Sequence, residues 1–229
     1  AAVVAARRLV AGGAIGEVEA VRVMVVIDKP ASYWRGGPLG RVDDAWRADP
    51  RRSGGGVVLM NGVHHLDLVR HLTGLEPVRV AGATLATRTG GVGVEEIAGA
   101  TLSLSNGAVV TLAASSRSAG AASQERIEID GSLGRLDLPD PYTGGPLQAF
   151  LRRSWGELPA GRRVEIAVPA RDPYRELLEA FARAVRSGSE PSATGRDGRA
   201  ALAAALAIYA SAASGCSVPV ELGTGPGRG

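Results

Sequence analysis

The feature of this sequence that most constrains its fold is the grouping of strand-like and helix-like segments along the chain. From residue 77 to residue 138, apolar residues follow the spacing of β-strands, and the dipeptide Asn106-Gly107 in their midst is a strong signal for a tight hairpin turn. Helical spacing dominates toward both ends instead. Consecutive strands joined by hairpins make an antiparallel sheet, whereas strands alternating with helices make a parallel one. The grouping therefore predicts an α+β fold and not a doubly wound sheet.

Periodicity and end signals place the individual elements. The expected helices cover residues 1–10, 57–73, 173–187 and 198–214, and the expected strands cover residues 18–27, 78–87, 97–105, 108–114, 125–130, 133–138, 163–168 and 218–222. Asp172 is a good N-cap for the third helix, whose Leu177, Leu178, Phe181 and Val185 form one apolar stripe.

Two segments are unusual for their length or their apolarity. The strand at 18–27 carries apolar residues on both faces, so we expect both of its faces to be covered. Residues 28–53 form a long loop rich in Gly and Pro that holds two of the three tryptophans. Long loops of this kind are often functional, and we expect this one to line a cleft.

Composition excludes several classes of partner and site. The net charge is only +3, the 25 arginines are dispersed, and few aromatic side chains are present for base stacking, so no nucleic-acid binding is expected. The single cysteine, Cys216, excludes an intrachain disulfide. Neither a run of about 18 apolar residues nor a signal peptide is recognisable, so we expect no membrane partner and a cytoplasmic location.

The densest candidate chemistry lies between Gly54 and Asp67. All three histidines fall at or near this segment, and His64, Asp67 and His71 share one face of the expected helix. Three interpretations remain open: helix capping and hydrogen bonding to loops, a metal site, or a general acid/base role for His64 with Asn61 orienting a substrate. The glycine triplet before the helix lacks Gly-x-Gly-x-x-Gly spacing and does not follow a strand, so we discount nucleotide binding there.

A resemblance to a known family joins these observations. Residues 53–76 resemble the signature of the glucose–fructose oxidoreductase/inositol dehydrogenase (Gfo/Idh/MocA) family of NAD(P)-dependent enzymes: a glycine triplet, five residues, Gly-x-His-x-x-Asp, and an apolar helix ending in Gly. Other segments fall at family-like places in the same order, namely residues 6–9, 13–18, Trp46-Arg47, Glu95-Glu96, Asn106-Gly107, 172–174, 188–191 and 208–211.

The resemblance implies a division of labour between two domains. Family members pair an N-terminal Rossmann domain, which binds NAD or NADP, with a C-terminal domain. The resemblance implies that this second domain is built on a large, open, mainly antiparallel sheet with helices packed on one face. It implies that residues 1–16 are a helix and linker from the missing Rossmann domain, that 17–222 form the substrate-binding and oligomerisation domain, and that 223–229 are a disordered tail. It also implies that no cofactor-binding residue lies in this chain, which we therefore expect to be inactive alone.

The resemblance also implies roles for particular residues. A histidine at the place of His64 relays the proton of the substrate hydroxyl, and Asn61 would orient the substrate. Many members have an acidic or amide residue where this sequence has Met60. The residues Lys29, Tyr33, Trp34, Trp46 and Arg47 are candidates for the substrate-binding wall. Lys29 lies in an Asp-Lys-Pro sequence that imitates a Glu-Lys-Pro motif of the Rossmann part, but it follows the first strand of the sheet domain.

The sequence thus favours the substrate-binding half of an NAD(P)-dependent oxidoreductase acting on a sugar, polyol or related hydroxy compound. The family commonly dimerises through the open sheet face, and the apolarity of residues 21–27 and 108–112 predicts a homodimer of that kind. Two alternatives remain: a non-catalytic binding or assembly module of the same fold, and a metal-dependent hydrolase that uses His64, Asp67 and His71.

Overall fold

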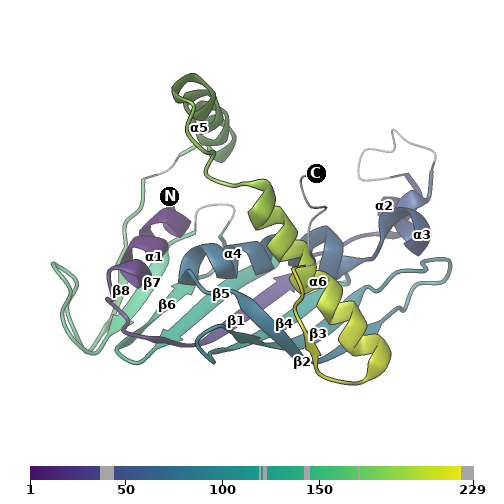
Figure 1. The fold of residues 1–229 in the computed structure, drawn as a ribbon, viewed down its shortest axis with the longest axis horizontal. Helices are drawn as coiled ribbons and strands as arrows, with labels where there is room; N and C mark the ends of the chain where they lie inside the picture. Colours follow the sequence, from purple (N-terminus) through teal and green to yellow (C-terminus); the bar gives the residue numbers. More distant parts are fainter. Residues whose placement is uncertain (37–43, 119, 121–122, 142–144, 170, 223–229) are drawn as a thin grey trace, which may run out of the picture.

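A single sheet forms the base of the molecule (Figure 1). The computed structural model describes residues 1–36, 44–118, 120, 123–141, 145–169 and 171–222. In these residues the nine strands are ordered β8-β7-β6-β5-β1-β4-β3-β2-β9, and every neighbouring pair is antiparallel except β1 and β4. The strands are β1 (Val18–Val26), β2 (Pro77–Ala86), β3 (Ile97–Leu104), β4 (Val109–Ser115), β5 (Gln124–Gly131), β6 (Gly134–Leu138), β7 (Leu147–Leu151), β8 (Arg163–Ile166) and β9 (Val218–Pro219).

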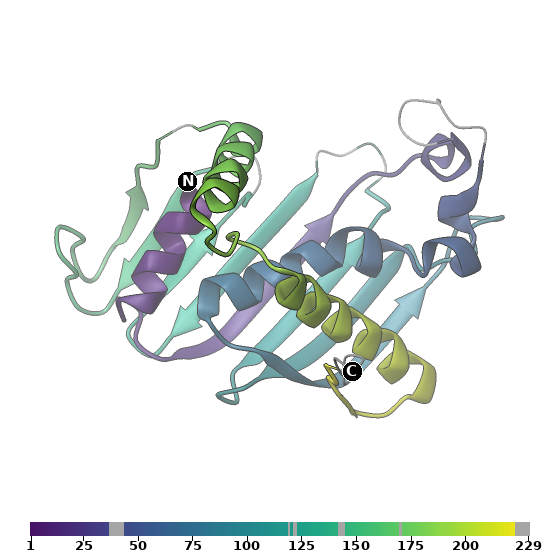
Figure 2. The same ribbon diagram turned by 45° about the horizontal axis from the view of Figure 1, so that its top comes forward.

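The helices gather on one face of the sheet and leave the other open (Figures 1 and 2). In this layer α1 contacts β6 and β7, α4 contacts β1, and α6 contacts β2. The expected α+β fold is therefore confirmed. The helices are α1 (Ala2–Ala11), α2 (Ala31–Gly36), α3 (Pro50–Ser53), α4 (Val63–Thr73), α5 (Pro173–Ser187) and α6 (Gly195–Ser214), with a 3₁₀ turn at Trp46–Ala48 and a π-helical turn at Val58–Gly62. No helix of the described residues combines the length and the apolarity needed to cross a bilayer.

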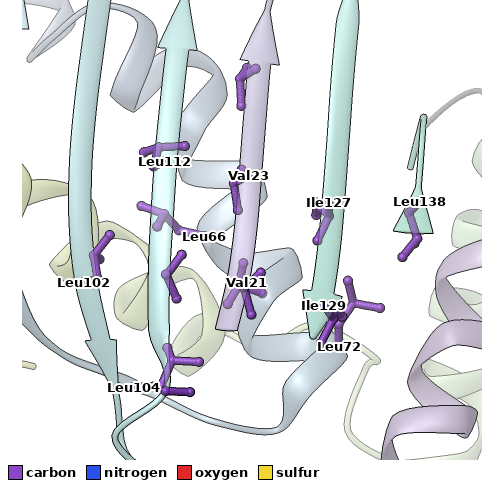
Figure 3. Packing of buried hydrophobic residues seen from close by; sticks show 14 of the residues in the cluster. Val21, Val23, Leu66, Leu72, Leu102, Leu104, Leu112, Ile127, Ile129 and Leu138 are labelled. Atoms are coloured by element: carbon purple, nitrogen blue, oxygen red, sulfur yellow. The ribbon is translucent and has the colours of Figure 1, made fainter. Parts of the chain in front are cut away.

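The core lies between the sheet and the helix layer (Figure 3). Along β1, Val21, Val23 and Val25 are buried, and Leu66 and Leu72 of α4 belong to the same apolar cluster. The alternation of β1 thus points one set of side chains at the helices, as the period of two of a strand requires.

The opposite face of the sheet carries no helix among the described residues of this one chain, so the coverage of both faces of β1 stays a prediction about assembly. Arg22 on that face is exposed and forms an ion pair with Asp130 at 2.6 Å. The neighbouring Arg126 bonds Asp137, and Arg135 pairs with Glu128. Charged side chains therefore lie across β1, β5 and β6, beside the exposed Thr111 and Ala113 of β4.

Helices α5 and α6 both begin at side chains that cap their first turn. The Asp172 carboxylate accepts hydrogen bonds from the N–H groups of Tyr174 and Arg175, as its N-cap position predicts. Helix α6 begins three residues before the expected Gly198, because Thr194 and Asp197 form a reciprocal capping box.

Two expectations for irregular or short segments were wrong. The expected loop at 28–53 contains α2, the 3₁₀ turn and α3, while its residues 37–43 and the tail 223–229 lie outside the described part of the chain. Strand β7 was not predicted. Its buried residues alternate with Gln148 and Phe150, and the exposed aromatic ring of Phe150 obscures the polar half of the pattern.

The apolar stripe of α5 lies at the surface. Leu177, Leu178, Phe181 and Val185 are 58–69% exposed, and Tyr174 at the start of the helix is 77% exposed. Only Ala184 of this helix is buried. Helix α5 thus contributes little to the core and presents an apolar face outward.

Candidate functional site

The start of the α4 region is held by a buried carboxylate. Glu95, which is 6% exposed, accepts hydrogen bonds from the N–H groups of Gly56 (2.8 Å) and Val58 (2.9 Å) and from the hydroxyl of Tyr209 (2.6 Å). A carboxylate at the beginning of a helix is stabilised by free amides and by the helix dipole. Burial, followed by the bond to Glu95, raises the pKa of Tyr209 far above its ordinary value, so this hydroxyl stays a donor.

The glycine triplet makes this close packing sterically feasible. A Cβ at Gly56 would lie 1.8 Å from the backbone oxygen of Glu95, and one at Gly55 would lie 2.1 Å from the Tyr209 hydroxyl oxygen. The amides that would bind a phosphate in a glycine-rich loop are therefore taken by a side chain of the protein itself. This geometry agrees with the sequence argument against nucleotide binding at the triplet.

Between the triplet and α4 the helix widens into a π turn. The N–H of Val63 reaches the carbonyl of Val58, five residues earlier. Such turns occur frequently at functional sites. Met60 and Asn61 lie in this turn, and Asn61 is half-buried, with its side-chain oxygen accepting a hydrogen bond from Lys29 Nζ.

Lys29 reaches this turn from the end of β1. Its backbone N–H donates to the carbonyl of Ser116 at 3.0 Å, which extends the pairing of β1 with β4 by a few residues. The ammonium nitrogen lies 3.9 Å from Met60 Sδ and 4.5 Å from the centre of the Tyr33 ring. A cavity of about 330 Å³ adjoins the same residue, with Thr89 and Arg117 among its lining.

A second cation shares the Tyr33 ring. The guanidinium carbon of Arg47 lies 5.2 Å from the centre of that ring and 4.6 Å from the Trp46 ring. Of the candidate wall residues, the structure thus brings Lys29, Tyr33, Trp46 and Arg47 together beside Asn61. Trp34 is different: it is 2% exposed and packs with Ala48, Val92 and Val94 in a small apolar cluster, so its assignment to the substrate-binding wall is corrected to a supporting core residue.

The environment of Lys29 changes its protonation. Burial, and after it the positive charge of Arg47, lowers the pKa of the Lys29 ammonium, Glu125 and Glu95 act in the opposite direction, and the net pKa is about 8. A lysine of this kind exchanges protons near neutral pH far more readily than an exposed one.

The two neighbouring histidines of α4 have different surroundings. His64 is exposed and lies three residues after Asn61, about one helical turn along the chain. His65 is 1% exposed, and its Nε2 lies 3.1 Å from a carboxylate oxygen of Glu125 on β5. His65 thus fixes α4 to the sheet, and this fixes the direction in which His64 points.

The third histidine takes part in a separate polar cluster at the other end of α4. Arg7 of α1 donates to the carbonyl of His71, and Asp67 pairs with Arg70 at 3.1 Å instead of with His71. Burial and the charge of Arg7 lower the pKa of His71. No group of three His, Cys, Asp or Glu side chains in the described ranges is arranged to hold a metal ion, so the geometry gives the metal-dependent hydrolase interpretation no support.

Sequence reasoning missed the residues that hold the site from a distance. Glu95, Glu125, His65 and Tyr209 were not among the candidate site residues, although the pair Glu95-Glu96 and residues 208–211 were noted in the family resemblance. Their contacts join positions 37 to 114 residues apart. The available signals were these two family-like segments, the first of which directly precedes an apolar strand pattern.

Comparison with known proteins assigns the chain to a family. A family model described as the GFO/IDH/MocA C-terminal domain matches residues 3–137, and the chain belongs to this family. It is 27% identical over 220 residues to the 1,5-anhydro-D-fructose reductase of Ensifer adhaerens, covering 96% of this chain and 61% of that protein. It is also 27% identical over 224 residues to the inositol 2-dehydrogenase of Rhizobium meliloti (strain 1021), covering 91% of this chain and 58% of that protein.

Solved structures share the fold. A levoglucosan dehydrogenase in complex with NADH superposes with a TM-score of 0.79 at 24% identity, over 96% of this chain and 63% of that one. The aldose-aldose oxidoreductase of Caulobacter crescentus, complexed with glycerol, gives a TM-score of 0.77 at 24% identity, over 95% of this chain and 60% of that one. The chain therefore spans about three fifths of the length of these relatives.

The packing at Gly56 leads to a stability prediction. We expect Gly56→Ala to lower the free energy of unfolding by about 1–3 kcal/mol or more, because the added methyl group would overlap the Glu95 backbone. Urea unfolding followed by circular dichroism measures this. The matched control is Gly198→Ala in α6, where a Cβ meets nothing within 4 Å and helix propensity alone predicts a gain of about 0.5–1 kcal/mol. Equal stability of the Gly56→Ala variant and the parent would contradict the packing role.

The position of Lys29 leads to a titration prediction. Lys29 is the only lysine of the chain, so selective ¹³C labelling of lysine gives one side-chain signal to follow by NMR. We expect it to titrate near pH 8 in the folded chain and near 10.4 in urea. Because the folded chain binds fewer protons between these values, this residue's contribution to stability rises with pH across that window.

Two variants test the causes of the lowered Lys29 pKa, because they are expected to change this pKa in opposite directions. Arg47→Gln removes a repelling charge and should raise the pKa of Lys29, whereas Glu125→Gln removes an attracting charge and should lower it. A folded-state titration near 10.4 in the parent chain would show that Lys29 is solvated and does not lie in the cluster.

Proposed function

We propose that this chain is the substrate-binding half of an NAD(P)-dependent oxidoreductase that acts on a sugar, polyol or related hydroxy compound. The observation that carries the proposal is the hydrogen bond from Lys29 to Asn61 at the π turn before α4 of a GFO/IDH/MocA C-terminal domain, with the exposed His64 three residues after Asn61. The names of the sequence relatives, a sugar-derivative reductase and a polyol dehydrogenase, support the substrate class.

The proposed chemistry divides the work between two side chains. Oxidation of an alcohol removes a proton from its hydroxyl, and an imidazole accepts and returns protons at neutral pH. His64 is the residue we assign to this step, because it is exposed and lies three residues after Asn61. An amide does not titrate in this range, so Asn61 orients the hydroxyl, and its own orientation is held by Lys29.

The dinucleotide is bound outside this chain in our proposal. The one glycine-rich helix start in the described residues has its amides bonded to Glu95, so these residues do not fit a pyrophosphate. The apolar stripe of α5 supports a second domain above the helix layer, since four of its large apolar side chains are 58–69% exposed. A cytoplasmic location belongs to the same proposal and is consistent with the free, exposed Cys216.

Homodimerisation through the open sheet face is a further part of the proposal. That face presents small residues such as Gly82, Gly99 and Ala113 beside the cross-strand ion pairs of Arg22. Two such faces, flat and free of helices (Figure 1), can approach closely and are self-complementary in charge.

A non-catalytic binding module of the same fold is the second candidate. Met60 favours it, because the thioether beside Lys29 supplies neither a base nor a charge at the turn. The following experiment separates the two.

His64 provides the test of catalysis. In the longer protein that joins this chain to a dinucleotide-binding domain, we expect His64→Ala to lower kcat by about 10²- to 10⁴-fold, because a general acid/base is lost. Binding of the cofactor, followed by nicotinamide fluorescence, should remain. His71→Ala is the control on the same helix, since His71 faces Arg7 at the far end of α4. A longer protein that binds the cofactor but oxidises no sugar or polyol would favour the binding module, and turnover unaffected by His64→Ala would refute the role assigned to His64.

The sheet face provides the test of assembly. We expect light scattering to give twice the chain mass of 23.4 kDa at micromolar concentration. Thr111→Arg, which places a large cation on the open face, should give a monomer. Leu206→Arg on the exposed side of α6 should leave the dimer intact. A monomeric parent chain would refute the sheet interface.

A further inference from the structure

We propose that the ligand of this site carries an acidic group, a carboxylate such as that of a sugar acid, and that Lys29 and Arg47 bind it together. This inference rests on the proposed function and narrows its substrate class. It is carried by an excess of positive charge at a half-buried position between three separate segments of the chain.

The geometry places the two cations on one aromatic platform. Lys29 Nζ is 4.5 Å and Arg47 Cζ is 5.2 Å from the centre of the Tyr33 ring. The same Cζ atom of Arg47 also lies 4.6 Å from the centre of the Trp46 ring. Tyr33 in turn packs on the buried Trp34, with 5.3 Å between the ring centres, so the platform is anchored in the small apolar cluster.

Among the described residues, the positive charge of this platform has no matched anion: no carboxylate lies within 4.0 Å of a side-chain nitrogen of Lys29 or Arg47. The acidic residues whose charges act on Lys29 are Glu125 and Glu95, and both have other partners. Glu125 lies against His65, and Glu95 bonds Gly56, Val58 and Tyr209. Half-buried cations are stabilised by an anionic partner, and the acidic group of a bound ligand would supply one here.

The donors of the cluster fit a carboxylate better than a neutral hydroxyl. Lysine and arginine side chains only donate hydrogen bonds, and an ionised carboxylate only accepts them. Stacking occupies the faces of a guanidinium and leaves its in-plane N–H groups for an acceptor. Hydrogen bonds between such ionised groups are roughly twice as strong as neutral ones.

A matched pair of sugars tests the inference on the chain as it stands. D-Galacturonate and D-galactose differ only in carrying a carboxylate or a hydroxymethyl group on the ring, and the single ¹³C-labelled lysine reports binding directly. We expect galacturonate to shift the Lys29 signal saturably, with galactose binding about tenfold or more weakly, at an ionic strength held equal with sodium chloride.

Variants assign the effect to the platform. Arg47→Gln should weaken galacturonate about tenfold and leave galactose nearly unchanged. Arg51→Gln, which removes an exposed guanidinium from α3, is the matched control and should leave both affinities unchanged.

Other outcomes overturn the inference. Equal shifts with the two sugars would refute the acidic group while leaving the proposed oxidoreductase function intact. A galacturonate effect no larger than that of sodium chloride, or one insensitive to Arg47→Gln, would refute the site itself. The loss of turnover in His64→Ala is judged separately, so the failure of one proposal is distinguishable from failure of the other.

Discussion

The buried carboxylate of Glu95 is the interaction on which the candidate site depends. It joins the residue just before β3 to the start of the α4 region and to α6 through three hydrogen bonds of 2.6–2.9 Å. A buried charge with several donors is strongly stabilised, and one without them is costly. Because the bonds leave no space for a side chain at Gly56, the glycine triplet and Glu95 form one structural unit that sets where the π turn begins.

The glycine triplet and Glu95 position the π turn, where residues from distant parts of the chain come together. The parallel pairing of β1 with β4 carries Lys29 to the turn, and the α2 and 3₁₀ segments bring Tyr33 and Arg47 over it. His65 and Glu125 lock α4 to the sheet, so that the adjacent His64 faces outward. His65 and Glu95 are thus engaged in holding the start of α4 in place, and neither is free to take part in chemistry.

The sequence was sufficient for much of the fold, because strand alternation, the Asn106-Gly107 turn and the Asp172 cap are local signals. It failed where an exposed aromatic residue, Phe150, masked the alternation of β7. For the site, the residues near His64 were proposed from a resemblance, but Trp34 was misplaced, since a tryptophan in a Gly- and Pro-rich segment looks the same whether it lines a wall or supports one. The pKa of Lys29 follows from burial and from charges far away in sequence, which no local pattern contains.

We propose that Lys29, Asn61 and His64 of this chain form one ligand site that faces a dinucleotide-binding domain. The most direct test is a crystal structure of the longer protein with a nicotinamide cofactor and a sugar acid bound. We expect a sugar hydroxyl within hydrogen-bonding distance of His64, about 2.6–3.2 Å, with the acidic group between Lys29 and Arg47. A ligand bound by the cofactor domain without contact to any of these four residues would contradict it.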